Sequence, residues 1–155
     1  MATRKVAREL TPTEQQQFDD AHQEFMSKPL DYVRHDSNAR YDDALRRATS
    51  RYGMAFYGSW WLLVELLSAN KLHCYKVNDE DGWKLFAIDM SSVGIVWSVD
   101  ECKQFCQRLA EHGLIDAECY ERGTIVNNRV CREVDKYARA AAGKALGAWK
   151  TNRPK

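Results

Sequence analysis

The hydrophobic positions of this chain recur mostly at the spacing of an amphipathic α-helix. In SVDECKQFCQRLAEHG, residues 98–113, the apolar side chains fall on one helical face. The stretch MAFYGSWWLLVELLSAN, residues 54–70, is apolar nearly all round, which predicts a central, buried helix. The residues expected to share one core are Trp60, Trp61, Leu63, Leu66, Leu67, Phe86, Phe105 and Leu109.

Polar residues near the start of the chain mark a first helix. Thr11 as N-cap, Pro12 in the first turn and Glu14 three residues after the cap form a capping-box start, and Pro29 enforces a stop. The helix between them is polar with a thin apolar stripe, so we expect it on the surface or against a partner. The stripe consists of Phe18, Ala21, Phe25 and Met26.

Similar signals delimit three more helices. Asp42 is a natural N-cap for DALRRATSRYG, and Gly53 is a natural breaker after it. Ser98 with Glu101 forms a second capping box. NDEDGWKLFAIDMS, residues 78–91, is typical of a helix opened by acidic residues.

Short strands are expected in two regions. KLHCYKV, residues 71–77, alternates loosely and predicts one strand. LIDAECY and TIVNNRV lie on either side of ERG, and this spacing predicts a β-hairpin. CREVDKYARAAAGKALGAWKTNRPK, residues 131–155, is predicted to be helical in its first half and loosened by Gly143 and Gly147.

This order of elements matches a winged helix-turn-helix. We predict a mainly α fold with a small β-hairpin (α+β) and extra N- and C-terminal helices. The predicted segments are a basic arm with an accessory helix at 1–30, a winged-helix domain at 31–128, and a basic C-terminal helix and tail at 129–155.

A winged helix places its last helix-turn-helix helix in the major groove of DNA. Here that helix lies within 98–113, and the face opposite its apolar side would reach base edges. The candidate DNA-binding residues there are Lys103, Gln104, Gln107 and Arg108, with Arg122 in the predicted wing.

Composition limits the possible classes of protein. The 155 residues are enough for one ordinary domain with its own core, and the formal net charge of +1 neither favours nor excludes nucleic acid. Five cysteines with no CxxC pair favour a reduced, cytoplasmic compartment. The longest apolar run, 60–64, is far too short to span a membrane, so we expect no membrane partner.

The run HDSN at 35–38 resembles catalytic chemistry in its residue types. His35 and Asp36 are adjacent, however, so on an extended backbone they point apart and the acid cannot orient the base. We interpret the run as a loop that enters a helix, with Asp36 and Asn38 satisfying nearby backbone. His35 or Arg40 is expected to pair with Glu65, the lone acid on the apolar helix. No catalytic residue and no enzyme activity is predicted.

Zinc binding is the alternative for the cysteines. Cys102 and Cys106 are one helical turn apart, and His73 with Cys74, or His112, could complete a site. Both thiols nevertheless share the apolar face of their helix, where a free cysteine acts as a small hydrophobic residue. No metal or other cofactor is therefore predicted.

The sequence also resembles a known family. HDSNAR at 35–40 is followed by DDALRRATSRYGMAFYGSWWLLVELL at 42–67. Together these segments resemble the N-terminal winged-helix domain of phage and prophage replication-initiation proteins, the replisome-organiser and DnaD-like group. The resemblance implies a winged helix that binds double-stranded DNA at an origin or operator. It extends, with less specific motifs, to about residue 150.

Three departures from that family pattern matter. Ala44 and Leu45 stand where a basic residue often follows the family's Asp, and Phe56 replaces the first Gly of its GYG motif. Such initiators usually continue through a Gly-, Lys- and Ala-rich linker into a second domain. The sequence ends at Lys155 within a similar segment, which indicates either a fragment or a module that works alone.

Charge distribution supports two competing functions. Basic residues at both ends of the chain favour DNA, whereas acids at the starts of the two helix-turn-helix helices repel phosphate and favour a protein partner. We predict DNA binding, with recognition of a host or phage protein complex as the alternative. The basic residues are Arg129, Arg132, Lys136, Arg139, Lys144, Lys150, Arg153 and Lys155, with Arg4, Lys5 and Arg8; the acids are Asp79, Glu80, Asp81, Asp89, Asp100 and Glu101.

Overall fold

A computed structural model describes the backbone of residues 9–31, 35, 37–92 and 94–151. By its internal contacts the chain divides into two compact units. The larger comprises Lys28–Val134, and the smaller combines Met1–Ser27 with Asp135–Lys155.

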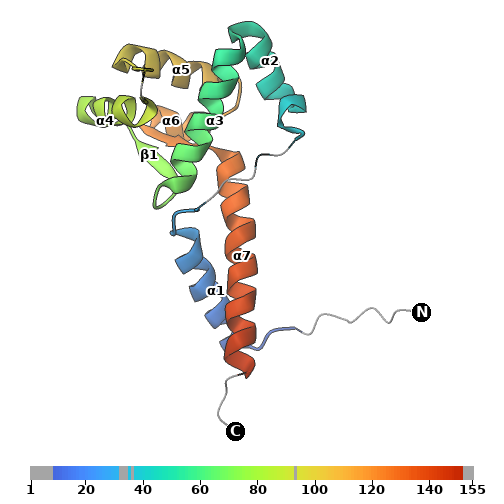
Figure 1. Ribbon diagram of the computed structural model, residues 1–155. Coiled ribbons are helices and arrows are strands. Elements are labelled where there is room, and N and C mark those ends of the chain that lie inside the picture. The colour runs from blue at the N-terminus through green and yellow to red at the C-terminus, as the bar shows by residue number, and fades with distance from the viewer. Residues whose placement is uncertain (1–8, 32–34, 36, 93, 152–155) are drawn as a thin grey trace. The chain divides into compact units, whose positions relative to one another are not determined.

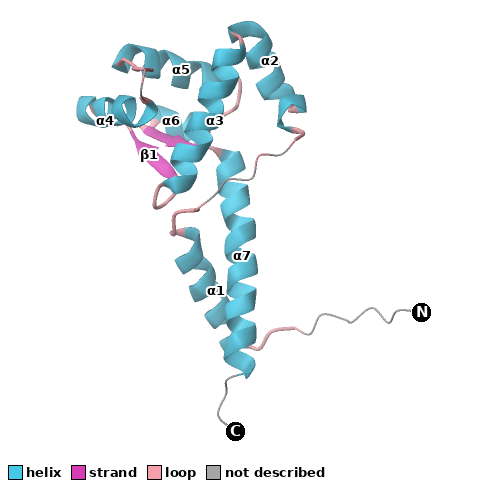
Figure 2. Ribbon diagram, in the orientation of Figure 1, coloured by secondary structure: helices cyan, strands magenta, loops and turns pink. Residues whose placement is uncertain are grey.

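The larger unit is mainly helical (Figure 1). Its short strands form one two-stranded antiparallel sheet (Figure 2). This is a mainly α, winged-helix-like fold of the α+β class. In chain order the elements are η1 (Ala39–Tyr41), α2 (Asp43–Tyr52), α3 (Met54–Ala69), β1 (Cys74–Lys76), α4 (Glu80–Met90), α5 (Val99–Glu111), α6 (Ala117–Glu121), β2 (Thr124–Val126) and the first turns of α7 (Asn128–Thr151).

The core of this unit surrounds α3, as its sequence predicts. Seven of the eight residues expected in the core are buried, and the eighth, Leu66, is half-buried. Phe56 of α3 meets Phe105 of α5 edge-on, with ring centroids 5.3 Å apart. Tyr75 of β1 meets Phe86 of α4 in the same way at 5.1 Å. These aromatic contacts tie the helices and the sheet to one core.

The predicted helix caps are confirmed. The Asp42 carboxylate accepts from Leu45 N–H at 3.0 Å and starts α2. At the start of α5, Ser98 N–H donates to Glu101 Oε2 at 2.7 Å and Glu101 N–H donates to Ser98 Oγ at 3.1 Å. Gly53, with φ of +89°, lies between α2 and α3. This left-handed backbone angle favours glycine, which explains the break between the two helices.

The predicted β-hairpin is wrong. Residues 117–121 form the helix α6 because the Asp116 side chain accepts from Cys119 N–H at 2.8 Å and caps a helical turn. The strand β2 pairs instead with β1, with Cys74 opposite Val126 and Lys76 opposite Thr124. The sheet is therefore closed by segments that lie far apart in the sequence.

The smaller unit is built from α1 (Pro12–Met26) and the C-terminal part of α7. Their side chains meet at His22 Nε2, which lies 2.8 Å from Asp135 Oδ1, and at Phe25, whose ring centroid is 6.5 Å from that of Tyr137. The capping box predicted at Thr11 is present. The apolar stripe of α1 is half-buried.

The prediction that glycines loosen the C-terminal helix is also wrong. The helix α7 continues through Gly143 and Gly147 to Thr151. One glycine costs a helix about 1 kcal/mol relative to alanine. Ala138, Ala142 and Leu146 are buried at four-residue spacing on the same part of α7, and the burial of this stripe offsets that cost.

We predict that Gly123→Ala destabilises the protein more than Gly113→Ala. Both glycines have positive φ, +81° and +68°, so both substitutions strain the backbone by about 1–2 kcal/mol. A Cβ on Gly123 would also lie 2.8 Å from Asn78 Cα, whereas one on Gly113 meets nothing within 4 Å. Urea unfolding measures both variants, and equal losses of stability would show that the approach to Asn78 is unimportant.

Candidate functional site

The outer face of α5 is acidic and amidic, not basic. Lys103 and Arg108, the cations predicted to read DNA, are half-buried at the edges of this face. Carboxylates here repel a phosphate backbone. The exposed residues of α5 are Asp100, Glu101, Gln104, Gln107 and Glu111.

Three of the four candidate base-reading residues contact neighbouring side chains. Lys103 Nζ lies 3.3 Å from the Glu80 carboxylate of α4. Gln107 donates to Glu111 Oε1 at 3.1 Å. The Arg108 guanidinium lies over the Tyr52 ring, 4.4 Å from its centroid. The structure therefore spreads these residues over the two flanks and the middle of α5.

The basic surface of the larger unit lies on α2. Arg46, Arg47 and Arg51 are all exposed, and we call these three residues the α2 arginine face. Leu45 and Ala48 bury the opposite side of the helix, with exposed fractions of 1% and 0%. No candidate site was predicted on this helix, although DALRRATSRYG contains the signal, because the spacing of its apolar residues leaves the arginines on one side.

Tyr52 connects the α2 arginine face to α5. Its ring lies 5.6 Å from the Arg51 guanidinium and 4.4 Å from that of Arg108, and the ring of His112 meets it edge-on at 5.5 Å. Two cations from different helices thus flank one aromatic ring. Such stacking orients guanidinium groups while it leaves their N–H edges available to acceptors.

The other predicted DNA-binding cations are dispersed. Arg122, which follows the end of α6, pairs with Glu118 of that helix at 2.8 Å, and Arg139 pairs with Asp135 at 2.8 Å. Arg129 lies 5.3 Å from the Trp61 ring centroid. Arg132 and Lys136 are exposed on α7, in the larger and the smaller unit respectively. Arg4, Lys5, Arg8, Arg153 and Lys155 and the side chain of Lys150 lie outside the described residues.

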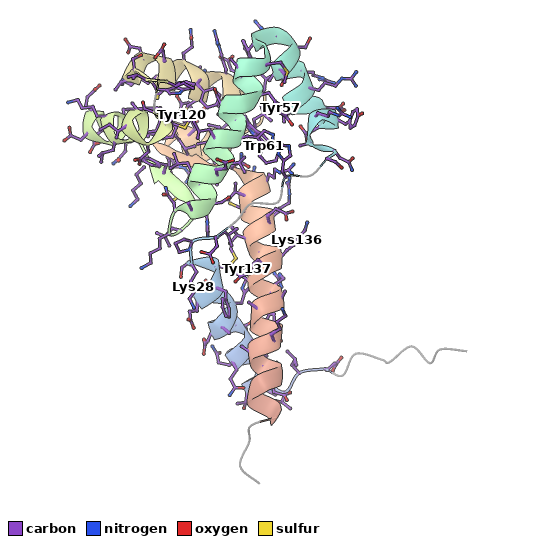
Figure 3. The ribbon with its side chains drawn as sticks, viewed as in Figure 1. Lys28, Tyr57, Trp61, Tyr120, Lys136 and Tyr137 are labelled. Atoms are coloured by element: carbon purple, nitrogen blue, oxygen red, sulfur yellow. The ribbon has the colours of Figure 1, made fainter. Side chains whose placement is uncertain are left out.

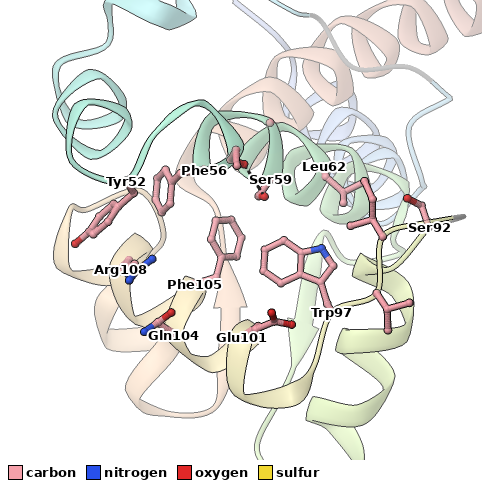
Figure 4. A pocket seen from close by; sticks show the side chains of 14 residues that line it. Tyr52, Phe56, Ser59, Leu62, Ser92, Trp97, Glu101, Gln104, Phe105 and Arg108 are labelled. Atoms are coloured by element: carbon pink, nitrogen blue, oxygen red, sulfur yellow. Dashed lines mark hydrogen bonds between the residues drawn. The ribbon is translucent and has the colours of Figure 1, made fainter.

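An apolar groove of about 560 Å³ runs along α5 on the side that faces α3 and the loop before α5. In the close view, Tyr52 and Arg108 lie at one end and Ser92 at the other, with Trp97 and Phe105 between them (Figure 4). The Phe105 and Trp97 rings have centroids 5.4 Å apart. The groove therefore has an aromatic floor with charged side chains along one edge.

Comparison with known proteins assigns a family. The family model described as Lin1244/Lin1753-like, N-terminal, matches residues 32–129, which is more than half of the 155-residue chain. The chain belongs to the Lin1244/Lin1753-like N-terminal family. No curated protein and no solved structure matches it. The Lin1244/Lin1753-like region contains the α2 arginine face, Tyr52 and the groove.

The HDSN run of the Lin1244/Lin1753-like region forms a loop and not a charge pair with α3. The His35 ring stacks on Trp61 with centroids 3.8 Å apart, and its Nε2 lies 3.5 Å from the Tyr57 hydroxyl. Figure 3 labels Tyr57 and Trp61 on α3. Glu65 is exposed, so the expectation that it needs a partner was wrong. Asp36 lies outside the described residues.

The prediction that the Asn38 side chain satisfies nearby backbone is wrong, because that side chain makes no capping hydrogen bond to η1. Tyr41 N–H donates to the Asn38 carbonyl at 2.9 Å, which closes the turn into η1. The Arg40 guanidinium is exposed and lies 5.0 Å from the Tyr41 ring centroid. The run does enter a helix, as predicted, but it does so through its backbone and not through the Asn38 side chain.

The two cysteines of α5 belong to the core. Cys102 and Cys106 are fully buried, and the described residues contain no group of three or more side chains suited to hold a metal ion. His73, a possible third ligand, is buried with Nδ1 3.1 Å from the Leu67 carbonyl and Nε2 2.9 Å from that of Lys28. Burial, helped by the charge of Glu101, raises the pKa of Cys102 to about 11, and burial also raises that of Cys106. A protonated thiol is a poor metal ligand.

No helix in the described part of the chain is both long enough and apolar enough to cross a bilayer.

We predict that His35→Ala lowers stability without changing the binding of any ligand. The variant loses the stack on Trp61, which is worth about 0.5–1.5 kcal/mol beyond burial. Tyr57→Phe is the matched control, because it removes only the long hydroxyl contact and is expected to cost less. Urea unfolding measures both. Lost ligand binding in a His35→Ala protein that remains folded would indicate a direct functional role.

We predict that iodoacetamide at pH 8 labels Cys102 and Cys106 only after unfolding, whereas the half-buried Cys74 is labelled in the native protein. Since the folded state holds the Cys102 thiol protonated, its contribution to stability is complete below pH 9 and is lost as the pH rises towards 11. Peptide mass spectrometry and alkaline unfolding test the two effects. Stoichiometric zinc that disappears in Cys102→Ser would contradict this assignment.

Proposed function

We propose that this chain is a winged-helix DNA-binding protein that acts at a replication origin or an operator. The α2 arginine face is the single observation that carries the proposal. The resemblance of HDSNAR and of residues 42–67 to replication-initiation proteins of phages and prophages supports it. We place its action in the cytoplasm, in keeping with the five free cysteines.

The α2 arginine face suits the phosphate backbone. Arg46, Arg47 and Arg51 are exposed on one side of a short helix, and the hydroxyl of Ser50, also exposed, can donate a further hydrogen bond. Arginines that neutralise phosphates release counterions, and this release supplies most of the sequence-independent affinity for DNA. Within the described part of the chain these three arginines form no ion pair with an acid, and all three are exposed, so their guanidinium groups are available to phosphate.

If α5 contacts the edges of DNA bases, its glutamine side chains make the contact. Gln104 and Gln107 are exposed, and glutamine can pair bidentately with adenine. Asp100, Glu101 and Glu111 on the same face disfavour close approach to phosphate. We therefore assign affinity to α2 and leave selectivity to Gln107, because Gln104 borders the groove beside α5.

A protein-binding module is the second candidate, for instance one that inhibits or regulates a host protein complex. The acidic outer face of α5 and the adjoining apolar groove favour it. Winged helices serve both purposes, and the fold does not choose between them.

We predict that replacing Arg46, Arg47 and Arg51 together by Ala weakens binding to every DNA sequence alike. The slope of log affinity against log salt is expected to become shallower by about 0.9 for each arginine that neutralises a phosphate. Fluorescence anisotropy with a bound fragment and a scrambled duplex, at several salt concentrations, measures this change.

The control removes the same charge elsewhere. Lys71, Lys76 and Lys84 are exposed outside α2, and their combined replacement by Ala should leave the salt slope nearly unchanged. Gln107→Ala should reduce the preference for the bound fragment and keep the slope. If the unaltered protein binds neither duplex more tightly than micromolar at low salt, the protein-binding candidate replaces the DNA proposal.

A further inference from the structure

The groove beside α5 leaves hydrophobic side chains exposed at its rim. Val96 and Ile95, from the loop between α4 and α5, are 84% and 60% exposed. Two backbone hydrogen bonds between Ser92 and Ile95, of 2.9 and 3.0 Å, hold Ile95 in place. Aromatic side chains form the floor beside them (Figure 4). An apolar surface of this kind, rimmed by polar residues, is typical of an interaction site.

The groove has an acid near one end and a base near the other, with an amide between them. Glu101, Gln104 and Arg108 line it from α5, with the acid near Trp97 and the base near Tyr52 (Figure 4). Seven residues separate the acid from the base, which corresponds to roughly 10 Å along the helix. Gln104 lies between them, three residues from one and four from the other. Hydrogen bonds from Ser98 lower the pKa of Glu101, so its carboxylate is charged at neutral pH.

We propose that a second copy of this chain covers the groove, with the two α5 helices antiparallel about a two-fold axis near Gln104. In this arrangement Glu101 of each copy lies opposite Arg108 of the other. The two Gln104 amides meet at the axis, where each can donate to the other and accept from it.

The self-complementary charges favour a second copy over an unrelated occupant. A two-fold interface uses the same patch on both partners, so every acid must find a base from that same patch. The groove meets this condition with one acid, one base and a central amide. The exposed Val96 of one copy then covers the Tyr52 end of the groove in the other, since the loop lies at the opposite end from Tyr52.

Charge reversal in the full-length protein tests the proposal. Analytical ultracentrifugation should show a dimer for the unaltered chain. Arg108→Glu gives each copy two acids on the groove edge, and Glu101→Arg gives each copy two bases. For each single variant the dissociation constant of the dimer should rise by roughly a hundredfold or more, because like charges then face each other at two places in the interface. Mixing the two variants should restore a one-to-one dimer, since opposite charges face each other again.

Two further variants separate this effect from misfolding. Val96→Asp changes a side chain that is 84% exposed in one copy, so it should abolish the dimer while unfolding of the monomer stays unchanged. Arg46→Glu makes the same charge change as Arg108→Glu outside the groove and should leave the dimer intact. A monomeric unaltered protein at tens of micromolar, or a dimer that survives both Arg108→Glu and Val96→Asp, would overturn the proposal. A mixture of the two reversal variants that stays monomeric would do so as well.

Discussion

Burial of α3 is the constraint on which the rest of the larger unit depends. Leu63, Val64 and Leu67 are at most 1% exposed, so side chains must cover this helix on several sides. Trp60 and Trp61 show how strongly burial is favoured, since both rings are buried although their indole N–H groups have no hydrogen-bond partner among the described residues. Burying each indole is worth roughly 4–6 kcal/mol, against about 1–3 kcal/mol for an unpartnered N–H. The free energy gained by burying the two indole rings therefore exceeds the cost of leaving their N–H groups without hydrogen bonds.

Helices could be predicted from the sequence because their signals are local. Caps at Asp42 and Ser98 and three- to four-residue spacing define each helix within its own segment. The sheet could not be predicted in this way, because Cys74 pairs with Val126 and nothing local identifies that partner. Asp116 added to the error, since aspartate begins helices as readily as turns and here it caps α6.

The candidate functional surface could be predicted only in part, because some of its contacts are also not local. Periodicity correctly separates the buried face of α5 from the rest, but it does not reveal which neighbours lie along the two flanks. Lys103 meets Glu80 of α4, and Arg108 meets Tyr52 of α2, and both contacts depend on tertiary packing. The arginines of α2 needed no tertiary information. The predicted DNA contacts lay instead on α5, on the wing and on the C-terminal helix, because these follow from the helix-turn-helix pattern and from the basic tail.

Tyr52 is the residue through which the two proposals would be coupled. Its ring contacts Arg51, which we assign to phosphate, and Arg108, which we assign to a second copy of the chain. A partner carboxylate that fixes Arg108 would also fix the ring on which Arg51 rests, and so would lower the entropy lost when Arg51 binds phosphate. Such coupling is reciprocal, so DNA that orders Arg51 would strengthen the contact between copies by the same factor. Replacing Tyr52 by Leu keeps an apolar side chain but removes the ring, and should therefore uncouple the two events while each persists alone.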